Sequence, residues 1–116
     1  MGKMGKYLAN GFSPAMLEKL PSSVVIDRLD LLEFCTSIYH NDEIVNAIGH
    51  DSTVMLVNVL CKTNFSKNRI EIKLNRGDML YVVTLKERLP EGKILSDEEL
   101  RQMYRDGKVE FYGVIL

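Results

Sequence analysis

Residues 79–85, Met-Leu-Tyr-Val-Val-Thr-Leu, place apolar side chains at both alternating positions of an extended chain. Successive side chains of a strand point to opposite faces, so this segment needs cover on both sides and is typical of the centre of a sheet. A chain of 116 residues with such a strand is most simply one domain, spanning residues 1–116, with other elements layered on the sheet.

Further strands are predicted at 6–10, 23–27, 43–48, 68–75 and 109–116. The signal at 43–48 is weak. In contrast, residues 68–75 alternate cleanly, with Ile70, Ile72 and Leu74 on one side, and they predict a hairpin with 79–85. Strands interspersed with helices, together with one hairpin, favour an α+β fold with a single mixed β-sheet flanked by helices.

Helix signals occur in four segments, at 13–20, 30–38, 52–61 and 96–107. Ser13 is the predicted N-cap of the first helix. The second and fourth begin with capping boxes, Asp30 with Glu33 and Ser96 with Glu99. The third is apolar on nearly every side, which predicts cover on more than one of its faces.

Composition excludes several classes of function. The formal net charge of −1 gives no general attraction to nucleic acid or to anionic membranes. No apolar run approaches the roughly 18 residues of a membrane span, and no secretory leader is recognisable. Cys35 and Cys61 each lie on the apolar side of a helical pattern, so we expect small core residues rather than a disulfide or a metal site. No metal and no cofactor are expected.

The motif Ala-Ile-Gly-His-Asp-Ser-Thr, residues 47–53, lies where a strand gives way to a helix. Gly49 permits close approach of a ligand to the backbone, and the free N–H groups of a helix start attract anions. His50 is therefore a candidate proton donor to a bound phosphate. The alternative is that Asp51 or Ser52 caps the helix and His50 only occupies the loop; local sequence permits both interpretations.

A second candidate is the turn at residues 88–92, Arg-Leu-Pro-Glu-Gly. Arg88 has the donors to clamp a phosphate, and Glu91 can orient an imidazole or a hydroxyl. The alternative is a solvated turn whose charges serve only solubility. A basic corner at 67–69, with Asn68 and Arg69, is either a small binding patch or a solvated face. Ser13, beside Asn10, is a cap by default but can also hold a phosphate.

Phosphate-cradling glycine loops, dinucleotide-binding glycine triplets and serine-nucleophile elbows are absent from the sequence. The remaining histidine, glutamate, arginine and helix N-termini suit cleavage of an RNA-type phosphodiester by its own 2′-hydroxyl. In that reaction the protein need only orient groups, stabilise charge and protonate the leaving oxygen.

The sequence resembles the viral ring nucleases, a type III anti-CRISPR family of small archaeal-virus and phage proteins with bacterial relatives. The resemblance covers essentially the whole chain after Met4. It is carried by "YLAN" with "FS" at residues 7–13, "AIGHDST" at 47–53, "KNR" at 67–69 and "RLPEGK" at 88–93, in this order and spacing.

The resemblance implies a homodimer that binds cyclic tetra-adenylate across its interface and cleaves it, without metal, to linear di-adenylates with 2′,3′-cyclic phosphate ends. It implies that His50 is the general acid, that Glu91 positions it and that Arg88 contacts phosphate. The implied ligand-binding residues are Asn10, Ser13, Gly49, Asn68 and Arg69. The expected location is the cytoplasm, that of the host cell if the protein is virus-encoded.

Two alternatives stay open. One is a dimeric viral nucleic-acid-binding protein that uses the patch around Arg69, against which stand the near-neutral charge and the lack of interleaved aromatic residues. The other is a sponge, which binds the cyclic nucleotide without turnover. The presence of both His50 and Glu91 argues against a sponge, and neither DNA nor a membrane is an expected partner.

Overall fold

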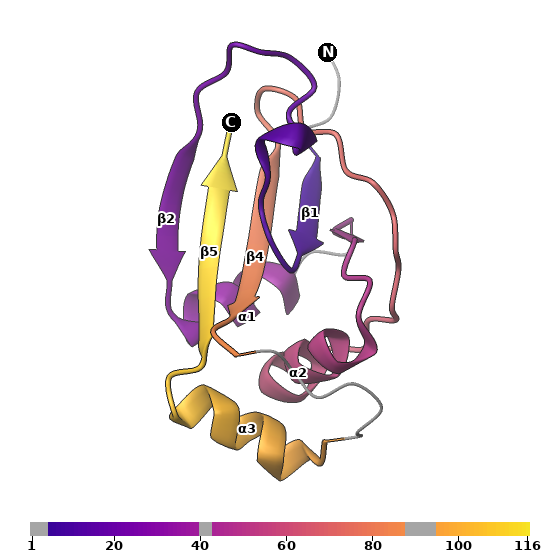
Figure 1. Ribbon diagram of the computed structural model, residues 1–116, viewed down its shortest axis with the longest axis vertical. Helices are drawn as coiled ribbons and strands as arrows, with labels where there is room; N and C mark the ends of the chain where they lie inside the picture. Colours follow the sequence, from indigo (N-terminus) through magenta and orange to yellow (C-terminus); the bar gives the residue numbers. More distant parts are fainter. Residues whose placement is uncertain (1–4, 40–42, 88–94) are drawn as a thin grey trace.

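The computed structural model describes residues 5–39, 43–87 and 95–116. Its strands form one five-stranded mixed sheet in the order β2-β5-β4-β1-β3, with the helices packed on it (Figure 1). This confirms the predicted α+β fold with a single mixed sheet. The elements in chain order are β1 (Lys6–Ala9), η1 (Pro14–Met16), β2 (Val25–Leu29), α1 (Leu31–Tyr39), β3 (Val45–Asn46), α2 (Asp51–Cys61), β4 (Met79–Leu85), α3 (Asp97–Arg105) and β5 (Val109–Ile115).

β4 is the central strand, as its two-sided apolar pattern predicts. It pairs in parallel with β1 and antiparallel with β5. Tyr81 and Val83 face the core that the helices cover, while Leu80 and Val82 face a second core on the opposite side. All four side chains are buried. Alternation along one strand therefore supplies apolar groups to two separate layers.

The helix-side core is closed by α1, α2 and α3. Phe34 of α1 is fully buried, and its ring lies 4.5 Å, centroid to centroid, from that of Phe111 in β5. Leu56 of α2 and Leu100 of α3 are buried in the same cluster. In the view of Figure 1, α2 and α3 lie next to each other at the lower end of the sheet.

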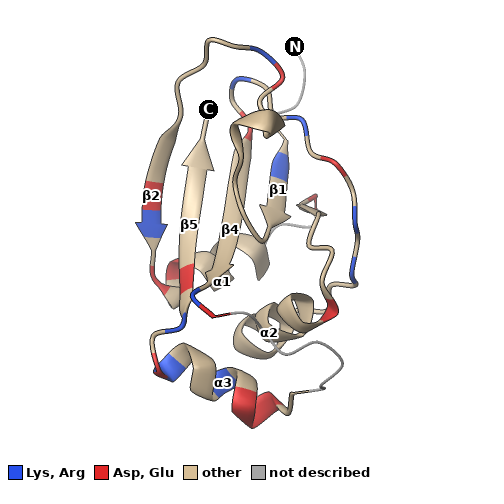
Figure 2. Cartoon of the chain, in the orientation of Figure 1, with Lys and Arg blue, Asp and Glu red and all other residues tan. Residues whose placement is uncertain are grey.

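Both predicted capping boxes are present. Asp30 Oδ1 accepts from the Glu33 amide over 2.7 Å, and Glu33 Oε1 accepts from the Asp30 amide over 3.2 Å. Ser96 and Glu99 make the equivalent pair of bonds at the start of α3. The first turn of α3 is also acidic and its last turn carries Arg105, which complements the helix dipole at both ends (Figure 2).

The predicted strand at 68–75 is wrong, and so is its hairpin with β4. The segment is extended, but among the described residues its strand-like pairing is one isolated bridge, Leu17 to Leu74. Ile72 and Leu74 are nevertheless buried, because the segment crosses the face opposite the helices and supplies that second core. The alternation reports an extended chain with one buried side, not membership of the sheet.

The helix predicted at 13–20 is also shorter than expected. Ser13 is the N-cap, with its Oγ accepting from the Ala15 amide over 3.3 Å, but only the three residues of η1 follow. The Met16 carbonyl instead accepts from the Leu74 amide over 2.6 Å. A tertiary hydrogen bond has replaced helix propagation, which is weak for so short a segment.

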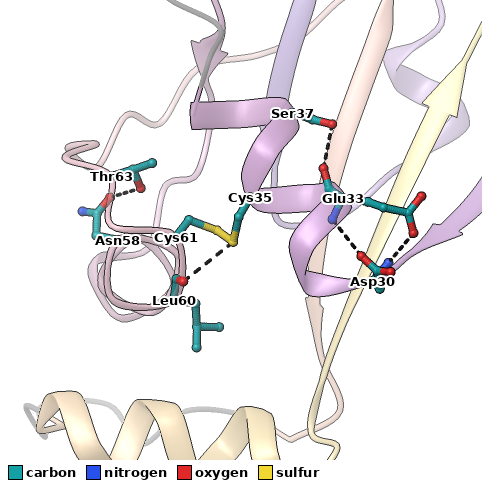
Figure 3. Close-up of a disulfide and its surroundings, with 8 residues drawn as sticks. All are labelled: Asp30, Glu33, Cys35, Ser37, Asn58, Leu60, Cys61 and Thr63. Atoms are coloured by element: carbon teal, nitrogen blue, oxygen red, sulfur yellow. Dashed lines mark hydrogen bonds between the residues drawn. A yellow bond between two sulfur atoms is a disulfide. The ribbon is translucent and has the colours of Figure 1, made fainter.

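The expectation for the cysteines is wrong as well. Cys35 of α1 and Cys61 of α2 form a disulfide, with their Cα atoms 4.9 Å apart (Figure 3). Both residues do lie at the helix-side core, as predicted. The apolar pattern within each helix does not reveal the pairing, because the bond depends on how α1 packs against α2.

None of the helices in the described parts of the chain is long and apolar enough to cross a membrane.

Candidate functional site

The carboxyl ends of β1 and β3 meet at one edge of the sheet. The two strands are parallel, with Leu8 beside Asn46, and the Ala47 amide donates to the Leu8 carbonyl over 2.8 Å. Asn10, which is exposed, follows β1, while residues 47–50 follow β3 and lead into α2. Open sheets with parallel strands bind ligands outside the carboxyl ends of those strands.

His50 is the N-cap residue of α2, and its side chain is exposed. Its backbone is extended, with φ −118° and ψ 126°, and its carbonyl accepts from the Val54 amide over 3.1 Å. The imidazole makes no capping hydrogen bond. The alternative in which Asp51 or Ser52 caps the helix is therefore wrong, because α2 begins at Asp51. The positive end of the helix dipole and an imidazole that makes no capping hydrogen bond lie at the same place.

Two lysines in and near the basic corner are held in ion pairs. Lys67 Nζ lies 3.3 Å from Asp51 Oδ2, and Lys73 Nζ lies 3.7 Å from Glu71 Oε1. Figure 2 shows both blue and red along this segment. Arg69 is exposed and makes no ion pair with any residue that the structure describes. Within the part of the chain that the structure describes, Arg69 is thus a cation without an ion pair beside the start of α2.

Gly49 and Arg69 are in close contact. A methyl group added at Gly49 would lie 3.2 Å from Arg69 Cβ, 3.2 Å from its Nε and 3.3 Å from its Cγ. The arginine stem therefore packs on the backbone immediately before His50. A side chain at this position would displace Arg69, so the glycine provides space for the arginine rather than an unusual backbone conformation.

Two asparagines hold the segments that carry Gly49 and Arg69. Asn46 Nδ2 donates to the Ser66 carbonyl over 2.7 Å, and its Oδ1 accepts from the Ile48 amide over 3.1 Å. Asn68 Nδ2 donates to the Asn46 carbonyl over 2.8 Å, and the Asn68 amide donates to the Ile48 carbonyl over 2.9 Å. We call Asn46 and Asn68, with these bonds to Ile48 and Ser66, the asparagine latch.

The structure brings together four of the predicted site residues, namely Gly49, His50, Asn68 and Arg69. Asn68 was predicted to bind ligand, and its side-chain amide is engaged within the protein by the latch. Ser13 is used as the cap of η1, which bonds to Leu74 at the other end of the extended segment. Leu74 is five positions along the chain from Arg69, about 16 Å in an extended segment.

Arg88 and Glu91 lie outside the described residues, and their predicted roles stay predictions. Within residues 5–39, 43–87 and 95–116, no group of three or more histidine, cysteine, aspartate or glutamate side chains is placed to hold a metal ion.

Sequence reasoning missed Asn46. Asparagine is common at strand ends and turns for local reasons, so nothing in the sequence distinguishes one that bonds to a segment twenty residues away. The motifs "AIGHDST" and "KNR" were the only available signal in the sequence. They indicate the residues that the latch holds in place, and they do not include Asn46.

Fold and site together define a small α+β protein with a mixed sheet, which presents a histidine and an arginine at the N-terminus of a helix. The model of the STIV B116-like family matches residues 6–112, and the chain belongs to that family. A solved structure, B116 of Sulfolobus turreted icosahedral virus, is 45% identical with a TM-score of 0.87, covering 97% of this chain and 99% of that chain.

Two viral relatives extend the comparison. "Uncharacterized protein ORF116" of Acidianus filamentous virus 1 is 49% identical over 109 residues, which are 94% of this chain and 93% of the relative. "Uncharacterized protein 26" of Sulfolobus islandicus filamentous virus is 34% identical over 73 residues, 62% of each chain. These likenesses place the chain in a family of small archaeal-virus proteins.

Proposed function

We propose that the protein is a ring nuclease, which binds cyclic tetra-adenylate and cleaves it to linear di-adenylates with 2′,3′-cyclic phosphate ends. Destroying this second messenger in the host cytoplasm would switch off type III CRISPR signalling and make the protein an anti-CRISPR. The proposal rests on the resemblance in sequence motifs and on the groups gathered at the start of α2.

The observation that carries the proposal is the state of His50. Its imidazole is exposed, is not used to cap α2, and stands one residue from the glycine on which Arg69 packs. A cation that has no ion pair with the described residues and a group that can donate a proton therefore share one end of a helix. Cleavage of a phosphodiester needs both, the first for the phosphate charge and the second for the leaving oxygen.

The proposed reaction uses a nucleophile that belongs to the substrate. The ribose 2′-hydroxyl attacks the adjacent phosphorus in line and loses its proton to solvent, the bond from phosphorus to the 5′-oxygen breaks, and protonated His50 donates its proton to that oxygen. Arg69 stabilises the phosphate charge, while Arg88 and Glu91 retain their proposed roles at phosphate and at His50. Because the attacking group is already in place, the chemistry requires no metal-activated water.

A homodimer is part of the proposal. Cyclic tetra-adenylate is a ring with two-fold symmetry, and a two-fold dimer presents the same groups to opposite phosphates. Each protomer then contributes one His50 and one Arg69, and each ring yields two di-adenylates.

The test is to incubate the purified protein with cyclic tetra-adenylate in EDTA and to separate the products. Linear di-adenylates with cyclic phosphate ends are expected. Intact ligand with tight binding would identify a sponge. No binding of the ring, together with retention of DNA, would identify a nucleic-acid-binding protein, although the pairing of Lys67 and Lys73 with carboxylates disfavours that outcome.

A further inference from the structure

Asn46 connects three parts of the molecule. Its backbone is paired with Leu8 in the sheet. Its side chain uses both ends of the amide: Oδ1 accepts from the Ile48 amide, which precedes Gly49, and Nδ2 donates to the Ser66 carbonyl, which precedes the segment with Arg69. A single amide thus ties the loop before His50 to a chain segment twenty residues away.

Asn68 closes the latch from the other side. Its backbone amide donates to the Ile48 carbonyl, and its side chain donates to the Asn46 carbonyl. The two segments are therefore fixed to each other at Ile48 and Asn68. The next residue of each segment is Gly49 in one case and Arg69 in the other. This accounts for their close contact, in which a methyl carbon added at Gly49 would lie 3.2 Å from Arg69.

Arg69 itself has no ion pair among the described residues to hold its guanidinium in place. The described contacts that place Arg69 are the bonds of the latch, which position its backbone, and the packing of its stem on Gly49. An arginine on a free segment would have to be ordered when a ligand arrives, and that ordering weakens binding.

We propose that Asn46 is a positioning residue that holds Arg69 against the N-terminus of α2 and pre-organises it for an anionic ligand. Its effect on cyclic tetra-adenylate rests on the proposed function. Its effect on the latch does not, and the two are measured separately.

The latch is tested by amide hydrogen exchange in the free protein. Asn46→Ala removes both side-chain hydrogen bonds, of which the one to the Ser66 carbonyl joins the two segments. Loss of that one bond of ordinary strength should accelerate exchange of the Asn68 amide about tenfold. The matched control is Asn58→Ala: Asn58 holds Phe65 through bonds of 2.9 Å at both ends of its amide, but that contact lies outside the latch. The control should accelerate exchange of Phe65 and leave Asn68 unchanged. Unaltered exchange of Asn68 in Asn46→Ala would overturn the proposal.

Asn46→Asp provides a milder variant should the alanine fold poorly. It keeps an acceptor for the Ile48 amide but has no donor for the Ser66 carbonyl. We expect Ile48 to stay protected and Asn68 to exchange faster. If the Ile48 and Asn68 amides exchange as slowly in this variant as in the wild type, the result would count against the latch.

The positioning role is tested by a double-mutant cycle that measures affinity for cyclic tetra-adenylate. The variants are Asn46→Ala and Arg69→Ala, singly and together. All are made in a His50→Ala background, which prevents turnover. Asn46→Ala should weaken binding about tenfold when Arg69 is present and have no further effect when it is absent. Equal weakening in both cases would show a merely structural role. If the wild-type protein does not bind the ring at all, the ring-nuclease proposal fails, while the exchange measurement still decides the latch.

Discussion

The Gly49→Ala substitution should weaken ligand binding without lowering the stability of the fold. The added methyl carbon would lie 3.2 Å from Arg69 Cβ and Nε. Because non-bonded carbons are most stable about 3.5–4.0 Å apart, Arg69 must move by at least about 0.3 Å. The backbone of Gly49 is not in the left-handed region, so alanine brings no conformational strain there.

The expected loss of affinity follows from the hydrogen bond between Arg69 and a phosphate of the ligand. A hydrogen bond between a charged arginine and a phosphate contributes about 1.5–3 kcal/mol. Its complete loss would weaken binding about 10- to 150-fold, since about 1.4 kcal/mol corresponds to a factor of ten. Stability should move the other way: replacing glycine by alanine at a compatible position stabilises a protein by about 0.4–1 kcal/mol through the unfolded chain.

The assay measures affinity for cyclic tetra-adenylate and the melting temperature of the same variant, again in a His50→Ala background. Gly113→Ala is the matched control, because its methyl carbon would meet Leu29 Cδ1 at an ordinary 3.5 Å and Gly113 lies on β5. We expect weaker binding with an unchanged or higher melting temperature for Gly49→Ala only. Unchanged affinity, or an equal loss in both variants, would refute the reasoning about Arg69.

Two further predictions concern stability. The Cys35–Cys61 disulfide closes a loop of 26 residues, so its reduction should lower the free energy of unfolding by about 3.5 kcal/mol in the chain-entropy treatment. Denaturant titration with and without dithiothreitol measures this difference. Identical unfolding midpoints would contradict the prediction. The hydrogen bond from Tyr112 lowers the pKa of Glu110, so Glu110 contributes stability above pH 4.5 that is lost as the pH falls through its lowered pKa. Tyr112→Phe should raise that pKa, as read by NMR titration of the carboxyl group; an unchanged pKa would contradict the assigned cause.

The elements predicted best are those whose signals are local. The capping boxes at Asp30 and Ser96 fixed the starts of α1 and α3, because each box satisfies amides within four residues. The apolar run of β4 predicted a central strand, because cover on both faces demands apolar groups at every position. Such features need no knowledge of the rest of the fold.

The elements predicted wrongly depend on distant partners. Residues 68–75 alternate because Ile72 and Leu74 enter the second core, and nothing local reveals that the segment stays outside the sheet. The helix after Ser13 ends early because Met16 bonds to Leu74. The disulfide depends on the packing of α1 against α2.

The same distinction between local signals and distant contacts applies to the candidate site. The position of His50 at a strand-to-helix junction was predictable from "AIGHDST", since glycine and a following apolar helix pattern indicate it. That His50 is itself the N-cap was not predictable, because aspartate and serine are preferred caps and both follow it. That Arg69 packs on Gly49 was not predictable either, because this contact depends on the latch between segments twenty residues apart.

The most direct test of the proposed proton donor is the single-turnover rate of cyclic tetra-adenylate cleavage by His50→Ala, measured with enzyme in saturating excess and with affinity determined in parallel. Loss of a general acid should slow cleavage by about 10²- to 10⁴-fold. Affinity should change little, since Arg69 is untouched. Cleavage by this variant at the wild-type rate would contradict the account.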